Sequence, residues 1–242
     1  MKKFALITGA SGGIGIAIAK ELASCGWNLY LHYNQNEQKI IELIDELNDL
    51  YDQIELIPIY ADLLTDEGSH ILANSIFQLD AIVCSSGVAP YGLFSDLDEK
   101  TMDNMLQLHV KSPMVLIQAL LPRLLKNSAS KIVLISSIWG QTGAACEVIY
   151  STVKGAQIAF VKSLSKELAR SGLTVNCIAP GAINTNMLNQ FSEDEIMELE
   201  AEIPVGRLGK PEEIANTVSF LLSNKATYIT GQVLAVNGGW YT

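Results

Sequence analysis

The stretch Thr8-Gly9-Ala10-Ser11-Gly12-Gly13-Ile14-Gly15 joins the apolar run Phe4–Thr8 to the helical pattern Ile14–Cys25, and this junction of strand and helix indicates the class of fold. Glycines at this spacing allow a tight turn, close approach of the backbone to a pyrophosphate, and close packing of helix on strand. Free N–H groups at the helix start attract phosphate charge. The stretch therefore predicts a dinucleotide site. An ordinary glycine-rich turn is the alternative, which the position after the first strand disfavours.

Short apolar runs alternate with longer helical patterns along the chain, which predicts one α/β domain over residues 1–242 with a parallel sheet covered by helices. Their near-continuous hydrophobicity predicts strands buried on both faces. The predicted strands are Phe4–Thr8, Asn28–Tyr33, Ile54–Tyr60, Ala81–Ser85, Lys131–Ser136, Thr174–Ala179 and Val233–Asn237. The predicted helices are Ile14–Cys25, Glu37–Leu50, Thr65–Phe77, Thr101–Lys126, Val148–Arg170 and Pro211–Leu222, with a short helix near Ser192–Ala201 in the otherwise irregular stretch Gly181–Lys210.

Composition excludes several classes of protein. The net charge of −10 disfavours a nucleic-acid partner, which requires clustered Lys and Arg. The apolar runs are too short for a signal peptide or a membrane span. The four cysteines are far apart, which disfavours a metal site and favours buried free thiols in a reducing, cytoplasmic setting.

The segment after the second strand bears on the choice of cofactor. An acidic residue there would bind the ribose hydroxyls and repel a 2′-phosphate, but the sequence reads His32-Tyr33-Asn34-Gln35-Asn36. This favours NADP(H) over NAD(H). Asp62, after the third strand, is placed to accept a hydrogen bond from the adenine amine or to cap the following helix, and the sequence leaves both roles open.

An acid–base group is predicted from three residues. Ser137 ends the fifth strand, and Tyr150 and Lys154 lie four positions apart on one face of the next helix. A nearby ammonium is expected to lower the pKa of the Tyr150 phenol from its usual value of about 10. Tyr150 could then donate a proton to a carbonyl oxygen while Ser137 holds that oxygen by a hydrogen bond.

These motifs resemble those of the short-chain dehydrogenase/reductase family, and most of all its bacterial β-ketoacyl-acyl carrier protein reductases. The resemblance also covers Ala61-Asp62-Leu63, Pro180-Gly181-x-Ile183-x-Thr185, Gly206-Arg207 and Val236-Asn237-Gly238-Gly239. It implies a Rossmann-type, doubly wound parallel sheet of about seven strands with helices on both faces. It also implies a homotetramer, in which helices 101–126 and 148–170 form one interface. The turn and the resemblance together place the cofactor on Gly9, Ser11, Gly13, Ile14, Gly15, Asn34, Asp62, Leu63, Ser86, Gly87, Tyr150, Lys154, Pro180, Gly181, Ile183 and Thr185.

The sequence departs from the family pattern at three places. Cys84-Ser85-Ser86-Gly87 replaces Asn-Asn-Ala-Gly, and His109 replaces the asparagine that is the fourth catalytic member. Either a catalytic role for His109 or a locally satisfied histidine fits the sequence. The arginines with which carrier-protein reductases bind their acidic partner align with Ser128 and Ser171, although Lys126 and Arg170 lie nearby.

The sequence therefore predicts an NADPH-dependent oxidoreductase that converts a ketone to a secondary alcohol. Its pocket is expected from residues 87–95, 138–147 and 182–207, including Trp139, Gln141 and Met187. The ketone could be carried on an acyl carrier protein, as the resemblance implies. A related group of reductases acts on a ketone attached to a lysine of translation elongation factor P, which is a second possibility. A nucleotide-binding regulatory module without catalysis is the alternative of another class.

Overall fold

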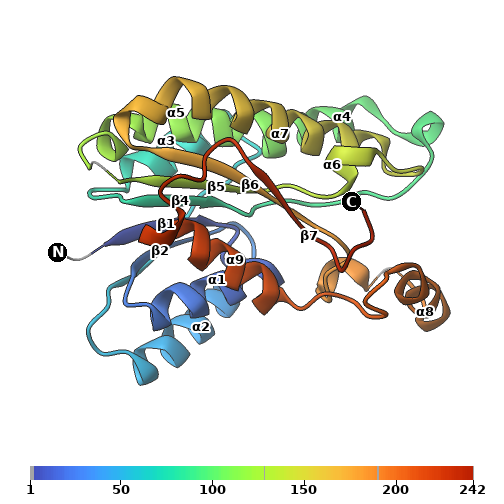
Figure 1. Cartoon of the computed structure of the whole chain (residues 1–242), viewed down its shortest axis with the longest axis horizontal. Coiled ribbons are helices and arrows are strands. Elements are labelled where there is room, and N and C mark those ends of the chain that lie inside the picture. Colours follow the sequence, from blue (N-terminus) through green and yellow to red (C-terminus); the bar gives the residue numbers. More distant parts are fainter. Residues whose placement is uncertain (1–2, 128, 190, 242) are drawn as a thin grey trace.

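The strands form one parallel sheet whose order places the first and fourth strands side by side. A computed structural model describes residues 3–127, 129–189 and 191–241. Within them, seven parallel strands have the order β3-β2-β1-β4-β5-β6-β7 (Figure 1). They are β1 (Phe4–Thr8), β2 (Asn28–Tyr33), β3 (Leu56–Tyr60), β4 (Ala81–Cys84), β5 (Lys131–Ile135), β6 (Thr174–Pro180) and β7 (Val233–Val236). The prediction of a Rossmann-type sheet is confirmed.

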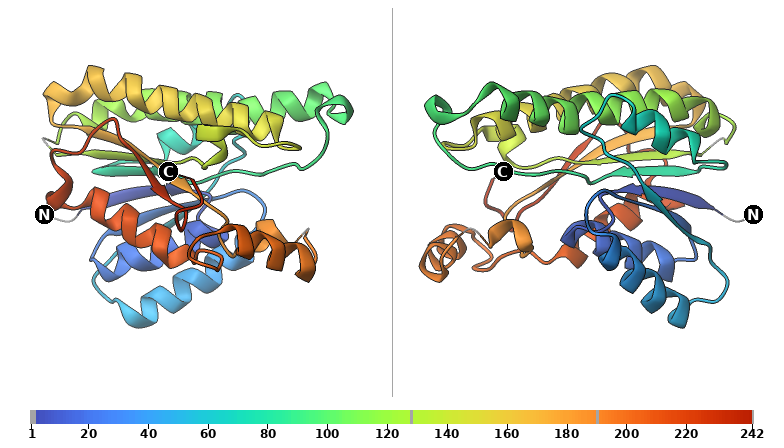
Figure 2. Two further views of the ribbon diagram at one scale, coloured as in Figure 1. Left: turned by 45° about the vertical axis from the view of Figure 1, so that its right-hand side comes forward. Right: turned by 180° about the vertical axis from the view of Figure 1, so that it is seen from behind.

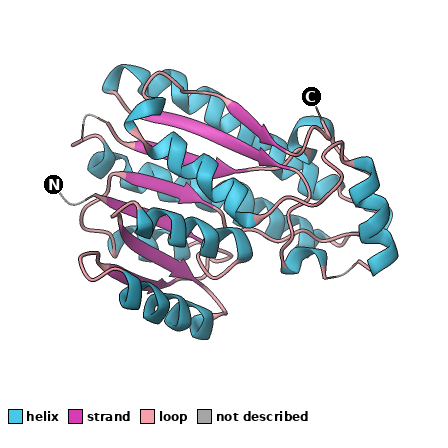
Figure 3. Cartoon of the chain, turned by 60° about the horizontal axis from the view of Figure 1, so that its bottom comes forward, coloured by secondary structure: helices cyan, strands magenta, loops and turns pink. Residues whose placement is uncertain are grey.

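Helices cover both faces of the sheet, and each helical layer packs on its own apolar core (Figures 1 and 3). One layer contains α1 (Gly13–Ser24), α2 (Glu37–Leu50) and α9 (Pro211–Leu222). The other contains α3 (Gly68–Asn74), α4 (Glu99–Leu106), α5 (Ser112–Leu124), α6 (Trp139–Thr142) and α7 (Val148–Leu168). The remaining helix, α8 (Glu193–Glu202), lies apart from both layers at one end of the molecule (Figure 2).

The two edge strands differ from the prediction that every strand is buried on both faces. All residues of β1, β2, β4, β5 and β6 are buried, whereas β3 and β7 consist mostly of partly or fully exposed residues. Tyr60 on β3, for example, is 60% exposed. An edge strand has a neighbour on one side only, so its apolar sequence does not ensure burial.

The predicted helix Thr101–Lys126 is interrupted near its middle. A π-helical turn, η2 (Gln107–Lys111), separates α4 from α5. Pro113 explains the interruption, because it has no N–H group to donate to the carbonyl of His109, four residues earlier. Single π-helical turns of this kind are frequent at functional sites.

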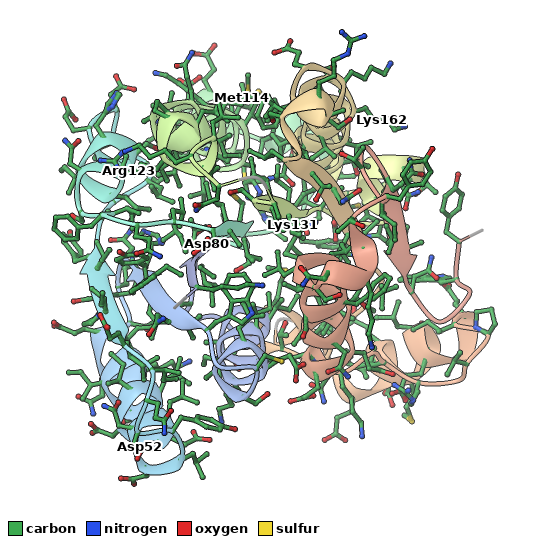
Figure 4. All side chains as sticks on the ribbon, turned by 60° about the vertical axis from the view of Figure 1, so that its left-hand side comes forward. Asp52, Asp80, Met114, Arg123, Lys131 and Lys162 are labelled. Carbon is green, nitrogen blue, oxygen red and sulfur yellow. The ribbon has the colours of Figure 1, made fainter. Side chains whose placement is uncertain are left out.

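Asp80 fastens the amino ends of the strands, at the opposite edge of the sheet from the glycine-rich turn. Its carboxylate accepts hydrogen bonds from Phe4 N (2.8 Å) and Asn127 Nδ2 (3.0 Å), and its carbonyl accepts one from Lys131 N (3.0 Å). Figure 4 shows Asp80 and Lys131 at this end of β4 and β5. These contacts connect the strands at their amino ends and do not occupy the carboxyl edge of the sheet, where the glycine-rich turn lies.

A buried histidine links the glycine-rich turn to the neighbouring strands. His32, 3% exposed on β2, accepts a hydrogen bond from Gly9 N at Nδ1 (3.1 Å) and donates one from Nε2 to the Ala61 carbonyl (3.0 Å). Burial lowers the pKa of His32 to about 4, against a weaker opposing effect of the Ala61 contact. The imidazole is therefore neutral, as its acceptor role at Nδ1 requires.

We predict that His32 makes the folded state sensitive to mild acid. Below the ordinary pKa of 6.5, the unfolded chain takes up a proton on His32, whereas the folded chain does so only near pH 4. The free energy of unfolding should therefore fall from pH 7 to pH 5, with about 2 kcal/mol of the loss due to His32. The free energy of unfolding can be measured with urea at pH 7 and at pH 5. Between these two pH values, His32→Gln should lose about 2 kcal/mol less than the wild-type protein. Equal losses in the two proteins would contradict the assignment.

Candidate active site

A cavity of about 650 Å³ opens at the carboxyl edge of the sheet, where loops after β1, β4, β5 and β6 meet. Open α/β sheets bind ligands at this edge, where the strand order reverses on either side of β1 and β4. Residues from all three predicted pocket segments line the cavity, including Trp139 and Met187. Gln141 is exposed and lies outside the lining, so its predicted place in the pocket is wrong.

The glycine-rich turn has the geometry that a pyrophosphate requires. A Cβ on Gly15 would lie 2.1 Å from the Gly9 carbonyl oxygen, and one on Gly9 would lie 2.8 Å from Ser86 Cα. Gly12 caps α1 without a side-chain hydrogen bond, so N–H groups at the helix start are left for an anion. Ser86 Oγ is buried and has no hydrogen-bond partner among the described residues. The turn, with Ser11 and Ile14 beside it, therefore fits the phosphates of a dinucleotide.

The predicted adenosine side is already organised by internal hydrogen bonds. Asp62 Oδ1 accepts from Asn34 Nδ2 (3.2 Å) and from Leu64 N (3.0 Å). The second bond is a turn contact within the loop. The predicted role of Asp62 as a helix cap is wrong, because α3 begins later, at Gly68, and its N-cap is Glu67. Leu63 is 4% exposed, so only its backbone is available to a ligand. Its carbonyl accepts a hydrogen bond from Ser112 Oγ.

The segment after β6 lies against the turn after β1. A Cβ on Gly13 would lie 2.8 Å from Thr185 Cγ2, which puts the start of α1 beside Thr185. Gly181 N donates to the Val236 carbonyl (3.0 Å), and Ile183 pairs with Gly209 in a short parallel bridge. Pro180, Gly181, Ile183 and Thr185 all line the cavity, so the structure brings these four residues, predicted to bind the cofactor, to the acid–base group.

Ser137, Tyr150 and Lys154 converge at the base of the cavity, as their spacing predicts. The Ser137 hydroxyl accepts a hydrogen bond from Trp139 N (3.2 Å) and contacts the Tyr150 hydroxyl. Lys154 Nζ lies 5.4 Å from the centroid of the Tyr150 ring. Gly140 allows this arrangement, because a Cβ there would lie 2.7 Å from the Lys154 carbonyl carbon.

Tyr150 does not have the lowered pKa that the sequence predicts. Burial raises its pKa, Glu147 raises it further, and the Ser137 contact opposes both. Lys154 does not offset these effects, and its Nζ donates instead to the Ile135 carbonyl (2.9 Å). Burial lowers the pKa of Lys154 to about 8. A phenol with a raised pKa stays protonated, which is the state that a proton donor needs.

His109 lies in the same wall of the site. Its ring is 0% exposed and meets the Tyr150 ring edge to face, with 5.9 Å between centroids. Nε2 contacts both the N–H (3.2 Å) and the carbonyl (3.0 Å) of Val88, while Nδ1 is buried and finds no hydrogen-bond partner in the described part of the chain. Gly87 makes room for the ring, because a Cβ there would lie 2.6 Å from Cε1. Burial, followed by the Lys154 charge, lowers the pKa of His109, so the imidazole is neutral.

The outer part of the cavity is acidic and aromatic. Among the described residues that line it, Lys154 is the one Lys or Arg, and it is 4% exposed. Two aromatic pairs, Tyr91–Phe191 and Trp139–Trp240, have centroid separations of 5.6 Å and 4.9 Å. The carboxylates belong to Glu147, Glu195, Glu198 and Glu202, of which the last three lie on α8.

The family model described as enoyl-(acyl carrier protein) reductase matches residues 9–241. The chain belongs to the short-chain dehydrogenase/reductase family. It is 53% identical to the uncharacterized oxidoreductase YmfI of Bacillus subtilis (strain 168), over the whole of both chains. It is 36% identical to the 3-oxoacyl-(acyl-carrier-protein) reductase FabG of Rickettsia bellii, over 97% of this chain and 95% of that one. The crystal structure of the angucycline C-6 ketoreductase LanV with bound NADP is 27% identical, with a TM-score of 0.92 over 98% and 95% of the two chains.

Two residues beside this dehydrogenase/reductase site were missed from the sequence. His32 binds the Gly9 amide, and Gln157 on α7 contacts Lys154 Nζ (3.4 Å). In the sequence, each is a polar residue at a position where the pattern predicts a buried apolar one. That mismatch could have marked both residues as candidates for the site. Cys84 and Cys177 are buried near Lys154, as predicted for free thiols. The same prediction is wrong for Cys25, which is exposed, and for Cys146, which is partly exposed.

The sequence also led to expectations about a carrier-protein surface, a membrane span and a metal site. Ser128 lies outside the described residues, and Ser171 is exposed at the end of α7. Across residues 3–127, 129–189 and 191–241, we find no helix that is both long and apolar enough to span a membrane. The same residues contain no group of three or more potential His, Cys, Asp or Glu ligands for a metal ion.

We predict that Gly15→Ala weakens dinucleotide binding at least tenfold, because the new Cβ cannot coexist with the Gly9 carbonyl at 2.1 Å. NADPH binding can be followed by nucleotide fluorescence. Gly92→Ala is the matched control, since a Cβ there has no neighbour within 4 Å. Undiminished binding in Gly15→Ala, or equal losses in both variants, would contradict the predicted role of the turn.

Proposed function

We propose that this family member transfers hydride from NADPH to a ketone and forms a secondary alcohol. The observation that carries the proposal is the convergence of Ser137, Tyr150 and Lys154 at the base of a cavity that the Gly9–Gly15 turn also borders. A phenol, a hydroxyl and an ammonium are the groups that protonation of a carbonyl oxygen needs.

NADPH fits the residues of the nucleotide side. The first carboxylate in the sequence after β2, Glu37, accepts a hydrogen bond from the Tyr33 hydroxyl (2.9 Å), and Asn34 stands where an acidic residue would repel a 2′-phosphate. The solved ketoreductase LanV, similar over nearly its whole length, has NADP bound. These observations support NADP(H) rather than NAD(H).

Each residue of the acid–base group has a defined part in the proposed mechanism. The cofactor supplies the hydride. Tyr150 donates its phenolic proton to the carbonyl oxygen, which becomes the alcohol oxygen, and the Ser137 hydroxyl donates a hydrogen bond to the same oxygen as charge develops on it. Lys154 holds positive charge beside the phenol and stabilises the phenolate that remains. The aromatic residues around the cavity exclude water from the reacting atoms.

The acidic lining bears on which ketone is reduced. The 36% identical FabG of Rickettsia bellii supports an acyl-carrier-protein thioester as substrate. However, a phosphate-bearing thioester on an acidic protein would meet the carboxylates of Glu147, Glu198 and Glu202 and a net charge of −10. The lining therefore favours the second candidate, a ketone attached to a lysine of translation elongation factor P.

The departures from the family pattern also suggest a regulatory module that binds nucleotide without catalysis. The buried phenol and ammonium of the site argue against this alternative. A module that only binds nucleotide has no need for a buried phenol beside a buried ammonium, and the buried charge costs stability. The proposal retains a cytoplasmic setting, which the four free cysteines support. A homotetramer formed through α5 and α7 also remains a prediction, which the family resemblance supports.

The substrate can be tested by direct competition. Wild-type protein is given NADPH with either a 3-oxoacyl thioester of acyl carrier protein or elongation factor P that carries the lysine-borne ketone. We expect higher kcat/KM for the ketone on elongation factor P. Higher kcat/KM for the thioester would assign the chain to carrier-protein chemistry instead.

We predict that Tyr150→Phe lowers turnover of a β-ketoester by at least 10³-fold, because the proton donor is lost. NADPH binding should stay within about threefold of wild type, since the phenyl ring keeps its packing. Turnover is followed by NADPH oxidation, and binding by nucleotide fluorescence. Retained turnover in the variant would exclude the proposed mechanism.

We predict that His109→Asn keeps at least a tenth of the wild-type turnover. The imidazole lines the cavity, but the link from this residue to Lys154 runs through the backbone carbonyl of His109, which accepts a hydrogen bond from Gln157. An asparagine at this position keeps that carbonyl. The same oxidation assay measures the effect. Complete loss of turnover with normal NADPH binding would show that the imidazole takes part in the reaction.

A further inference from the structure

Gln157 joins two parts of the site that are distant in sequence. Its side chain is buried on α7, three residues after Lys154, and the whole residue is 4% exposed. Nε2 donates to the His109 carbonyl (2.8 Å), and Oε1 accepts from Lys154 Nζ (3.4 Å). A buried amide must satisfy both ends, and here each end has a partner of the matching type.

The His109 carbonyl is available to Gln157 because of a feature of the backbone. Pro113 removes the N–H group that would bind this carbonyl in a continuous α-helix, and the chain forms the π-helical turn η2 instead. A buried carbonyl that lacks its helical donor must find another one. Gln157 supplies it from the facing helix.

Lys154 has few groups that favour its charge. Around Nζ, the described titratable groups are Tyr150 on the same helix, His109 from η2, Cys84 from β4 and Cys177 from β6. The imidazole of His109 is neutral, and burial raises the pKa of Cys84 to about 12 and that of Cys177 to about 11, so neither thiol is ionised at neutral pH.

Among the described residues, Lys154 Nζ donates hydrogen bonds to two oxygen atoms. They are the Ile135 carbonyl (2.9 Å) and Gln157 Oε1 (3.4 Å). Glu147 acts on Tyr150 rather than on Lys154. Removal of either acceptor therefore leaves the ammonium with a single oxygen partner in the described part of the chain.

We propose that Gln157 is a positioning residue, which ties the Lys154 ammonium to the His109 carbonyl and thereby keeps Lys154 charged and in place beside Tyr150. The inference rests on the proposed roles of Tyr150 and Lys154. Gln157 itself does not line the cavity, so it acts through Lys154 rather than on the substrate. Gln157 and the turn at Pro113 thus help to set the pH range in which Lys154 is charged.

Two substitutions of similar size should move the pH profile of kcat in opposite directions. Gln157→Met removes the acceptor, so Lys154 should lose its proton at lower pH, and the basic limb should move down by about one pH unit. Gln157→Glu places a negative charge beside Nζ, so the basic limb should move up by a similar amount. The measurement is kcat for a neutral β-ketoester with saturating NADPH from pH 6 to pH 10.

The controls separate positioning from general damage to the fold. Ser165→Ala removes a different buried polar group of α7, a hydroxyl that donates to Lys162 O within the same helix, and should leave the limb in place. If Gln157→Met does not fold, Gln157→Asn should also move the limb down, because its shorter side chain places the amide oxygen farther from Nζ.

Unmoved limbs, or limbs that move in the same direction in Gln157→Met and Gln157→Glu, would overturn the inference. That outcome is distinct from failure of the proposed function. If Tyr150→Phe is inactive while the Gln157 variants keep the wild-type profile, only the role of Gln157 is wrong. If Tyr150→Phe retains turnover, the reductase mechanism is wrong, whatever Gln157 does.

Discussion

The burial of one ammonium group constrains the rest of the site. Lys154 is 4% exposed, and within the described residues its Nζ donates to a carbonyl and an amide oxygen and to no carboxylate, so oxygen dipoles hold its charge. An uncompensated buried charge costs several kcal/mol, which is why the pKa of Lys154 falls to about 8. The residues that approach it, Ile135, Gln157 and Tyr150, must therefore be fixed precisely, and rigid elements of the fold fix each of them.

The fold supplies that rigidity by bringing separate segments to one edge of the sheet. Parallel strands end together there, and close contacts such as Gly15 against Gly9 and Gly140 against Lys154 leave no room for adjustment. Pro113 adds a constraint that secondary structure alone would not give. It interrupts a helix, and the freed His109 carbonyl connects η2 to α7 through Gln157.

Periodicity in the sequence predicted nearly all strands and helices, because burial between two helical layers imposes a regular pattern. It also predicted the convergence of Ser137, Tyr150 and Lys154, since their positions follow from strand ends and helix spacing. The π-helical turn was not predicted, because apolar periodicity continues through residues 101–126, although Pro113 in the middle of that pattern was a signal for an interruption. His32 and Gln157 depend on contacts between distant segments, which local patterns do not encode.

The electrostatic character of the cavity follows from where its charges lie. The start of α1 offers N–H groups and a partial positive charge to the phosphates of a dinucleotide. The carboxylates, by contrast, belong largely to α8, which lies apart from the layer that contains α1 (Figures 1 and 2). An anionic cofactor can therefore bind along one part of the cavity without approaching Glu198 and Glu202. In the proposed reaction, the part left for the ketone would favour neutral or cationic groups, because carboxylates line it.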